Sequence, residues 1–232
     1  MIVLEAVDLT KVYVGGDGGS ITVLDGVNLQ VSRGQMVAVV GASGTGKSTL
    51  LHLLGALDRP TRGSVLIGGQ STTGRDDDAL SAMRNRSVGF VFQFHHLLRE
   101  FTARENVMMP LRIAGWDEAR AQQRADDLLA RVGLSGRVHH RPAQLSGGEQ
   151  QRTAVARSLA IDPAVLLADE PSGNLDHMNS ERLHDLFAEL SRDLEIAMVI
   201  ATHNRSLAAR ADRTLLLEDG RLTDTDVREV VP

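Results

Sequence analysis

A glycine-rich run with a single lysine occupies residues 41–49. It fits the G-x-x-x-x-G-K-[ST] pattern of a phosphate-binding loop, and an apolar stretch precedes it while a helix-like stretch follows. Glycines let successive backbone N–H groups converge on phosphate oxygens, and the N-terminus of the following helix adds partial positive charge. Lys47 is therefore expected to reach the β- and γ-phosphates of a nucleotide, and Ser48 to hold Mg²⁺. The predicted phosphate-binding residues are Gly41, Ala42, Ser43, Gly44, Thr45, Gly46, Lys47, Ser48 and Thr49.

Lysine is rare in this chain, which strengthens the interpretation of the loop. Of 25 basic residues only Lys11 and Lys47 are lysines, and Lys47 stands where a phosphate-binding loop needs it. The planar guanidinium of arginine cannot replace a compact ammonium inside a tight loop. The alternative is a glycine-rich turn that binds no ligand.

A second glycine-rich helix start reads Leu-Ser-Gly-Gly-Glu-Gln-Gln-Arg over residues 145–152. Ser146 and Glu149 form a capping box, which by itself signals only that a helix begins. Gly147 and Gly148 would each cost up to roughly 1 kcal/mol relative to alanine, which favours close approach by another group such as a phosphate. The helix is expected to run to Ile161. This site and the first loop could share one nucleotide if the chain folded them face to face, or if two chains paired head to tail.

Two adjacent carboxylates follow the apolar run Val-Leu-Leu-Ala at residues 165–168. Open α/β sheets bind ligands at the carboxyl ends of their strands, where these acids are expected to lie. Asp169 is then placed to bind Mg²⁺ or its water shell, and Glu170 to act on an attacking water as general base. The alternative is an ordinary turn where a strand surfaces.

Composition excludes several classes of protein. The chain has 232 residues, 42% of them apolar, and these suit one domain with a substantial core. It has no cysteine, which excludes disulfides and thiolate metal sites. No apolar run approaches the length of a membrane span, so direct membrane insertion is not expected. A net charge of −5, no basic block and 3% aromatic residues argue against binding to nucleic acid.

The hydrophobic pattern predicts an α/β fold. Alternating apolar positions in the first seventy residues predict an antiparallel sheet, and later apolar runs that alternate with helical patterns predict a mainly parallel sheet covered on both faces. The predicted buried strands are Met36–Val40, Val88–Phe92, Val165–Ala168, Met198–Ala201 and Thr214–Leu217. The predicted helices include Ser48–Leu57, Arg75–Arg86 and Asp117–Val132, and residues 93–144 are mostly helical. The tail after Gly220 carries no interpretable motif.

The loop, the Leu-Ser-Gly-Gly-Glu-Gln run and the acidic strand, in this order, resemble an ATP-binding-cassette (ABC) ATPase over nearly the whole chain. The resemblance implies a P-loop NTPase fold of the ABC ATPase type. It would have a mainly parallel sheet core, an N-terminal antiparallel β subdomain and an inserted α-helical subdomain. Residues 1–232 would form one nucleotide-binding domain, with residues 1–93 and 160–232 in the RecA-like core and β subdomain and residues 94–159 in the helical subdomain.

The resemblance also implies roles for single residues. Tyr13 would stack on adenine, Gln93 would sense Mg²⁺ and the γ-phosphate, and His203 would contact the γ-phosphate. Asp176 would belong to the segment through which two subunits communicate. Taken alone, the first three have ordinary alternatives as an edge-strand aromatic, a helix-start glutamine and a structural histidine. The implied assembly is a homodimer formed on ATP binding. Each ATP would be held by one chain's loop and by the signature residues of the other chain, Ser146, Gly147, Gly148 and Glu149.

Residues 92–107 and 169–176 resemble ATPase subunits of lipoprotein-releasing transporters, and macrolide exporters and cell-division ATPases share much of them. Two small departures are Ser172, where threonine is common, and Asn204, where aspartate is common. The resemblance implies a peripheral ATPase on the cytoplasmic face of the inner membrane that docks on integral membrane permease subunits. The alternatives are a cell-division type of switch acting on cell-wall enzymes and an ABC ATPase that handles nucleic acid. The expected docking surface is Leu97, Leu98, Phe101, Val107, Met108 and Met109, unless these form the core of the helical part.

Overall fold

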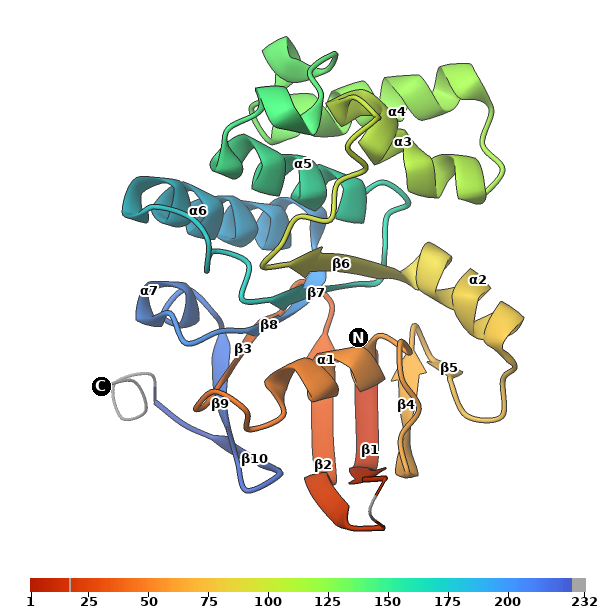
Figure 1. Ribbon diagram of the computed structural model, residues 1–232, viewed down its shortest axis with the longest axis vertical. Coiled ribbons are helices and arrows are strands. Elements are labelled where there is room, and N and C mark those ends of the chain that lie inside the picture. Colours follow the sequence, from red (N-terminus) through yellow and green to blue (C-terminus); the bar gives the residue numbers. More distant parts are fainter. Residues whose placement is uncertain (17, 227–232) are drawn as a thin grey trace.

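The computed structural model describes residues 1–16 and 18–226 of the chain. Within these residues the strands form two sheets, a six-stranded sheet of order β10-β9-β3-β8-β7-β6 and a four-stranded sheet of order β2-β1-β4-β5. Figure 1 shows the six-stranded sheet through the middle of the molecule, with α3, α4, α5 and α6 above it and the four-stranded sheet, with α1, below. The predicted α/β fold with a separate antiparallel sheet is confirmed.

The six-stranded sheet is parallel except at one edge, where β10 runs antiparallel to β9. Its central strands are buried along almost their whole length, as the apolar runs predicted. The edge strand β10 belongs to the tail for which the sequence offered no interpretation. The strands are β3 (Met36–Val40), β6 (Val88–Phe92), β7 (Val165–Asp169), β8 (Ala197–Ala201), β9 (Arg213–Glu218) and β10 (Arg221–Asp224).

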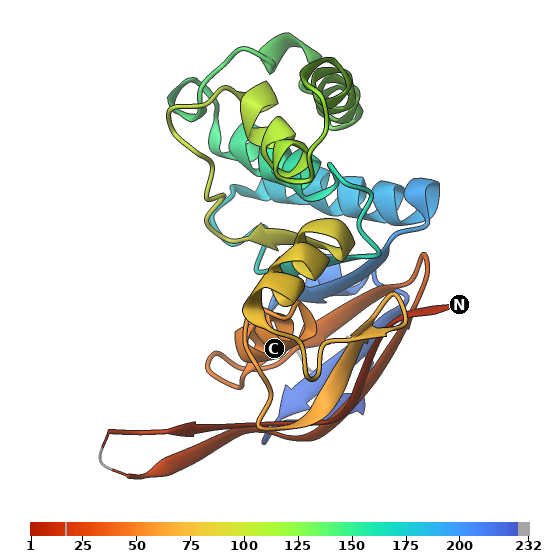
Figure 2. The same ribbon diagram turned by 90° about the vertical axis from the view of Figure 1, so that its right-hand side faces the viewer.

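The antiparallel sheet consists of β1 (Ile2–Val14), β2 (Ser20–Ser32), β4 (Arg62–Ile67) and β5 (Gln70–Ser71). The buried face of this sheet shares one hydrophobic core with α1 and with strands of the parallel sheet, as predicted from its alternating pattern. The far end of the β1–β2 hairpin extends beyond the body of the molecule (Figure 2).

A second hydrophobic core joins the helical part of the chain to the parallel sheet. It includes residues of α3, α4, α5 and α6 together with Leu166, Ala168 and Met198 of the sheet, so the boundaries near residues 94 and 159 stay a prediction. No helix within the described residues is long and apolar enough to cross a membrane. The helices are α1 (Lys47–Leu54), α2 (Asp77–Ser87), α3 (Ala103–Ile113), α4 (Glu118–Arg131), α5 (Gly147–Ser158), α6 (His177–Leu194) and α7 (Arg205–Ala208), with short 3₁₀ turns η1 (Ser135–Arg137) and η2 (Pro142–Gln144).

Two predicted helix ends were wrong. Helix α1 ends at Leu54 instead of Leu57, because Ala56 has a left-handed φ of 54° and Leu57 N–H turns back to His52 O at 2.8 Å, which closes the last turn. Helix α5 ends at Ser158 instead of Ile161, where the bonds Ala160 N–H to Arg157 O and Asp162 N–H to Leu159 O tighten the backbone into 3₁₀-type turns.

The predicted docking surface is also corrected in part. Val107 and Met108 are buried in the core of the helical part, because they lie on the face of α3 that packs against α4 and α5. Leu98, which belongs to the predicted surface, is exposed, and so are Phe94 and Ile113 at the end of α3. For Val107 and Met108, the alternative that they belong to the core of the helical part is therefore confirmed.

Candidate active site

The loop between β3 and α1 has a backbone that requires glycine. Gly41, Gly44 and Gly46 have φ angles of 151°, 83° and 103°, in the region that favours glycine. A Cβ on Gly41 would lie 2.5 Å from Leu217 O, and a Cβ on Gly46 would lie 2.7 Å from Val23 Cγ1. Larger residues at these two positions would displace the loop.

Lys47 lies back over its own loop. Its Nζ donates hydrogen bonds to Gly41 O at 2.7 Å and to Ala42 O at 2.8 Å, and its side chain is mostly buried. The ammonium is thus held at the mouth of the loop by two carbonyl oxygens. Phosphate oxygens are stronger acceptors for an ammonium than neutral carbonyls, so a nucleotide would take over this charge.

One pocket joins the loop to the two predicted carboxylates. Its volume is about 350 Å³, and loop residues face Asp169 and Glu170 across it. Asp169 is the last residue of β7. In the sheet, β8 lies between β7 and β3, and the three strands are parallel, so their carboxyl ends lie at the same edge. The two acids at the end of β7 therefore lie near the loop that follows β3. The lining residues are Val23, Ser43, Gly44, Gly46, Lys47, Ser48, Thr49, Asp169 and Glu170.

Glu170 and His203 form a pair at the carboxyl ends of β7 and β8. His203 Nδ1 lies 2.8 Å from Glu170 Oε1, and the Glu170 side chain is 19% exposed while that of His203 is 73% exposed. Glu170 has a φ of 44°, which is strained for a non-glycine residue by roughly 1–3 kcal/mol. Its N–H donates to Ala201 O at 2.9 Å, which holds this conformation. The carboxylate therefore has a fixed direction and an exposed partner.

Gln93 is joined to a residue that the sequence did not single out. Gln93 Nε2 donates to Asn174 Oδ1 at 3.1 Å, and Asn174 Nδ2 donates to the backbone oxygen of Gln93 at 3.2 Å. Gln93 does not line the pocket described above. The pair links the end of β6 to the segment after Glu170.

Tyr13 also lies outside that pocket, near the end of β1. Its hydroxyl donates to Asp58 Oδ2 at 3.1 Å, and Lys11 Nζ lies 4.8 Å from the centre of its ring. Lys11 also forms an ion pair with Asp58 at 2.7 Å. Burial raises the pKa of Asp58, but the hydrogen bond from Lys11 and the other bonds to this carboxylate outweigh burial. The pKa of Asp58 is therefore lowered, and the carboxylate stays ionised. Sequence reasoning missed Lys11 and Asp58, which together orient the ring.

The second glycine-rich site starts α5 with the predicted capping box. Ser146 Oγ accepts from the Glu149 N–H at 3.3 Å, and Glu149 Oε2 accepts from the Ser146 N–H at 2.8 Å. Arg137 Nε donates to the other carboxylate oxygen of Glu149 at 2.8 Å. The hydrogen bond from Arg137, with that from Ser146, lowers the pKa of Glu149 to about 2. Both oxygens of Glu149 are therefore used within the chain.

The pKa of Glu149 predicts how acid affects stability. Because its pKa in the folded chain lies below the ordinary 4.5, ionised Glu149 stabilises the fold above pH 4.5, and the contribution is lost as pH falls toward about 2. We expect Glu149→Gln to melt at a lower temperature than wild type at neutral pH, with a difference that shrinks toward pH 2. Calorimetry across this range tests it, with Arg137→Gln as the matched partner variant. A difference independent of pH would contradict the assignment.

The two glycines of this site have different reasons to be glycine. A Cβ on Gly148 would lie 2.7 Å from Asn179 Oδ1, so the packing of α5 against α6 already excludes a side chain there. A Cβ on Gly147 would meet only Leu175 Cδ2 at 3.8 Å, an ordinary contact. Of these two glycines, only Gly147 therefore leaves room for a ligand.

Asp176 caps the next helix beside this site. It accepts hydrogen bonds from the backbone N–H of Asn179 at 2.9 Å and from Asn179 Nδ2 at 2.6 Å, and the backbone bond is the main reason that the pKa of Asp176 is lowered. Asn179 in turn packs on Gly148, so the starts of α5 and α6 lie together. None of the residues 146–149 or 176 is among those that line the loop pocket of the same chain. The chain thus presents two separate candidate sites.

Comparisons with known proteins agree with this arrangement. A family model described as ABC transporter matches residues 24–173. The lipoprotein-releasing system ATP-binding protein LolD of Geobacter metallireducens is 54% identical over 219 residues, which cover 94% of this chain and 97% of that protein. The protein of the same name from Ruegeria pomeroyi is 55% identical over 215 residues, covering 93% and 94% of the two chains.

Two solved structures of the cassette MJ0796 resemble the whole chain. One, described as the dimeric structure of a bacterial ABC transporter cassette, has a TM-score of 0.87 with 37% identity. The other, described as a dimeric post-hydrolysis state bound to ADP and Pi, has a TM-score of 0.86 with the same identity. Both comparisons cover 97% of this chain and 99% of the other. The similarity thus includes both glycine-rich sites and the acidic strand.

Proposed function

Because this chain belongs to the ABC transporter family of ATP-binding proteins, we propose that it is the ATP-hydrolysing subunit of a bacterial lipoprotein-releasing transporter. ATP hydrolysis is the activity of the family. The observation that carries it here is the pocket in which the phosphate-binding loop faces Asp169 and Glu170. The proposal that the cargo is lipoprotein rests on relatives that match almost the full length of the chain and are named for a lipoprotein-releasing system.

In the proposed reaction, water attacks the γ-phosphate in line with the leaving oxygen of ADP. Backbone N–H groups of the loop and Lys47 hold the phosphates and offset their charge. Glu170 accepts a hydrogen bond from the attacking water and directs it, while His203, held by Glu170 at 2.8 Å, reaches the γ-phosphate from its exposed position. Positioning and electrostatics thus supply most of the catalysis.

The proposed Mg²⁺ ligands are the Ser48 hydroxyl, the Asp169 carboxylate and Gln93. Ser48 and Asp169 line the same pocket and would supply a hydroxyl and one carboxylate, whereas Gln93 lies outside that pocket, directly after β6. This suits Mg²⁺, which keeps several waters and takes one or two carboxylates plus substrate phosphates. When bound, the ion neutralises charge on the β- and γ-phosphates.

The proposed active form is a head-to-tail homodimer. Ser146, Gly147 and Gly148 lie outside the loop pocket of their own chain, and the start of α5 offers positive charge and an open backbone for the γ-phosphate of the other chain's ATP. Glu149 supports this site by capping α5, and Asp176 lies beside it at the start of α6. The solved structures of MJ0796 are described as dimers, which supports the proposal.

Tyr13 is proposed to stack on the adenine of the bound ATP. Lys11 lies over the ring while Asp58 holds the hydroxyl, so the orientation of the ring is set before a nucleotide arrives. The ring remains 43% exposed. A ring fixed in this way loses little conformational entropy when a base stacks on it.

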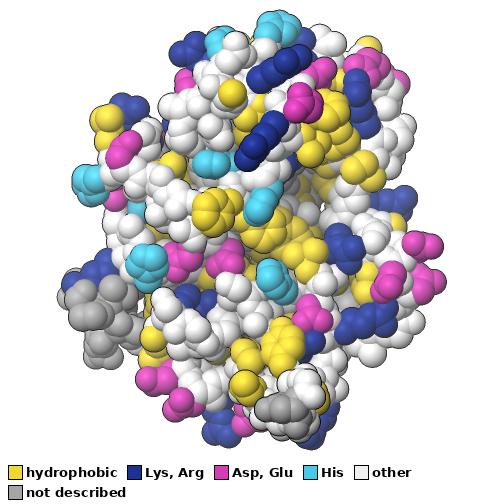
Figure 3. Space-filling model, in the orientation of Figure 1, with side chains coloured by type: hydrophobic (Ala, Val, Ile, Leu, Met, Phe, Trp, Pro, Cys, Tyr) yellow, Lys and Arg dark blue, Asp and Glu magenta, His cyan; other side chains and the backbone are white. Residues whose placement is uncertain are grey.

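The proposed partners are integral membrane permease subunits, which would place this chain on the cytoplasmic face of the inner membrane. A groove between α2, β6, α3 and the end of α5 offers an apolar docking surface, and Figure 3 shows hydrophobic side chains gathered in this part of the face. Its apolar lining residues are Val88, Phe90, Phe92, Met109, Pro110, Ile113 and Ile161. The groove shares Met109 with the surface predicted from the sequence and leaves out Val107 and Met108, which are buried.

Capture of the partner tests the cargo. Tagged Glu170→Gln protein is purified with ATP and Mg²⁺ from mildly solubilised native membranes, and co-purifying proteins are identified by mass spectrometry. Permease subunits of the lipoprotein-releasing type are the expected result. A division-type partner with cell-wall enzymes, or nucleic acid alone, would contradict the proposal while leaving the ATPase chemistry in place.

A further inference from the structure

The segment from Glu170 to Asp176 contacts most of the proposed catalytic residues. Its ends are Glu170 and Asp176, and Asn174 in its middle is bonded to Gln93. Two turns shape it: Gly173 N–H donates to Glu170 O at 3.0 Å, and Leu175 N–H donates to Ser172 O at 3.1 Å. Anything that holds the middle of this segment also sets the positions of its two ends.

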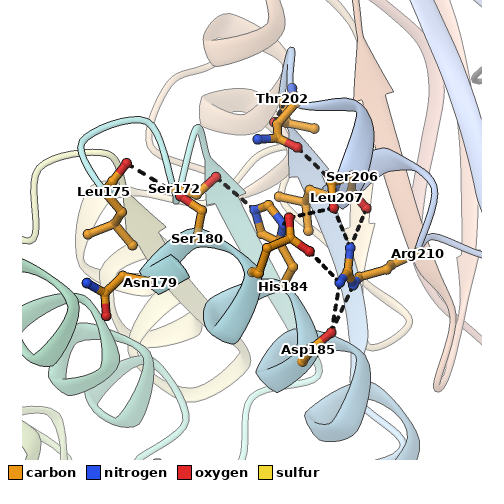
Figure 4. A network of polar contacts seen from close by, with 12 residues as sticks. Ser172, Leu175, Asn179, Ser180, His184, Asp185, Thr202, Ser206, Leu207 and Arg210 are labelled. Carbon is orange, nitrogen blue, oxygen red and sulfur yellow. Dashed lines mark hydrogen bonds and ion pairs between the residues drawn. The ribbon is translucent and has the colours of Figure 1, made fainter. Parts of the chain in front are cut away.

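A buried histidine on α6 holds the middle of the segment. His184 Nε2 lies 3.0 Å from Ser172 Oγ, and His184 is 0% exposed while Ser172 is 7% exposed (Figure 4). Burial lowers the pKa of His184 below its usual 6.5, so the ring is neutral at neutral pH. His184 Nδ1 makes no hydrogen bond within the described residues, but the negative charge of Glu181, whose Oε1 lies 3.5 Å away, favours a proton on Nδ1; Nε2 then accepts the hydrogen bond from the Ser172 hydroxyl.

The same contacts continue to the helix that follows His203. Glu181 accepts hydrogen bonds from Ser206 Oγ at 2.7 Å and from Arg210 Nη2 at 2.8 Å, and Arg210 also contacts Asp185 at 2.9 Å (Figure 4). The bond from Ser206, with that from Arg210, lowers the pKa of Glu181 to about 2, so its carboxylate is ionised. The network therefore joins the segment after Glu170 to α7, which begins two residues after His203.

The segment is held from its other side by α5. Gln151 is fully buried, and its Nε2 donates to Pro171 O at 2.7 Å and to Phe92 O at 3.0 Å. Pro171 is thus fixed through its backbone, and the next residue, Ser172, through its side chain. A buried polar pair such as Ser172 and His184 costs free energy unless both groups are hydrogen-bonded, so packing alone does not account for it.

We propose that His184 is a positioning residue for ATP hydrolysis, which acts by holding Ser172 and through it the segment that carries Glu170 and Asp176. Glu170 lies in a strained backbone conformation that only its surroundings maintain. Small misplacement of a catalytic group costs far more in rate than in binding, because alignment matters at the transition state. Loss of the Ser172–His184 bond should therefore lower kcat about ten-fold and leave KM for ATP nearly unchanged, since the phosphate-binding loop is untouched.

Steady-state ATPase kinetics on four variants of the full chain, with a fifth as control, test this role. Ser172→Ala and His184→Phe each remove the bond, and the double variant should be no slower than either one, because both break a single interaction. Ser172→Thr keeps the hydroxyl and should retain nearly full kcat. The matched control is Ser191→Ala, which removes a buried hydroxyl of the same helix that donates to Gly34 O and Ile196 O, far along α6 from the segment.

Melting temperature is measured beside kcat for every variant. Ser191→Ala is expected to lower the melting temperature without changing kcat, while Ser172→Ala lowers kcat. An unchanged kcat in Ser172→Ala would overturn the proposal, and so would additive losses in the double variant or an equal loss in Ser191→Ala. If His184→Phe does not fold, the comparison of Ser172→Ala with Ser172→Thr decides the question.

Discussion

Glu170→Gln protein is expected to bind ATP and form a stable dimer while its hydrolysis falls by about 10²–10⁴-fold, the typical contribution of a positioned general base. The amide has nearly the same shape as the carboxylate and still accepts from His203 Nδ1, so the pocket keeps its geometry. The variant lacks the carboxylate that, in the proposed mechanism, directs the attacking water and takes up its proton. Phosphate release measures the turnover, and light scattering with ATP measures the dimer.

If Glu170→Gln protein hydrolysed ATP at a near-normal rate, Glu170 would not be the residue that acts on the attacking water. His203→Ala serves as a companion, because it removes the partner of Glu170 but keeps the carboxylate. We expect it to lose activity as well. Both variants should still bind nucleotide, since neither side chain belongs to the phosphate-binding loop.

Lys47→Ala is expected to lose nucleotide affinity by about 100-fold, because a charge-assisted bond to phosphate is worth roughly 1.5–3 kcal/mol and Lys47 would make more than one. In the structure its ammonium is held by Gly41 O and Ala42 O at the mouth of the loop, ready for phosphate oxygens. Calorimetric titration with ADP measures the affinity, and a melting curve shows that the fold is intact.

Lys47→Arg separates charge from shape in the same assay. The planar guanidinium keeps the positive charge but does not fit between the two carbonyls, so we expect it to bind nearly as poorly as alanine. Affinity near that of wild type in Lys47→Ala would contradict the role of the loop. Comparison of Lys47→Ala with Glu170→Gln distinguishes a loss of nucleotide binding from a loss of hydrolysis.

The sequence predicted the core strands well because their signal is local. Met36–Val40 and Val88–Phe92 are short apolar runs bounded by polar or glycine residues, and the structure has strands with these bounds. The edge strand β10 was missed, since a strand at the edge of a sheet is exposed and lacks an apolar run. The end of α1 was missed because Ala56, a residue type that favours helices, has a left-handed φ of 54° there.

For the candidate site, the sequence identified residues with distinctive types and spacing but not their partners. Asn174 beside Gln93 and His184 beside Ser172 are ordinary residues in sequence, and only the packing of β6, α5 and α6 brings them to their positions. The free-energy cost of glycine in the first turn of a helix correctly marked the second site, but it did not identify why each glycine is there. It pointed to both glycines of the second site, whereas Gly148 is already required by Asn179.

We propose that each ATP lies between the loop of one chain and the start of α5 in another. Lys47→Ala disables the loop. Gly147→Glu is expected to disable the second site with little effect on the fold. A Cβ there meets only Leu175 Cδ2 at 3.8 Å, and a carboxylate suits the first turn of a helix, yet it would repel a phosphate. Each variant alone has a defect at both composite sites, but a mixed dimer has one site with two intact halves.

The most direct measurement is therefore the ATPase rate of the two variants, each alone and mixed in equal amounts. The account predicts that neither variant hydrolyses ATP alone and that the mixture regains a substantial fraction of wild-type activity. A mixture as inactive as its components, or full activity of Gly147→Glu alone, would contradict the claim that the nucleotide site is shared between two chains.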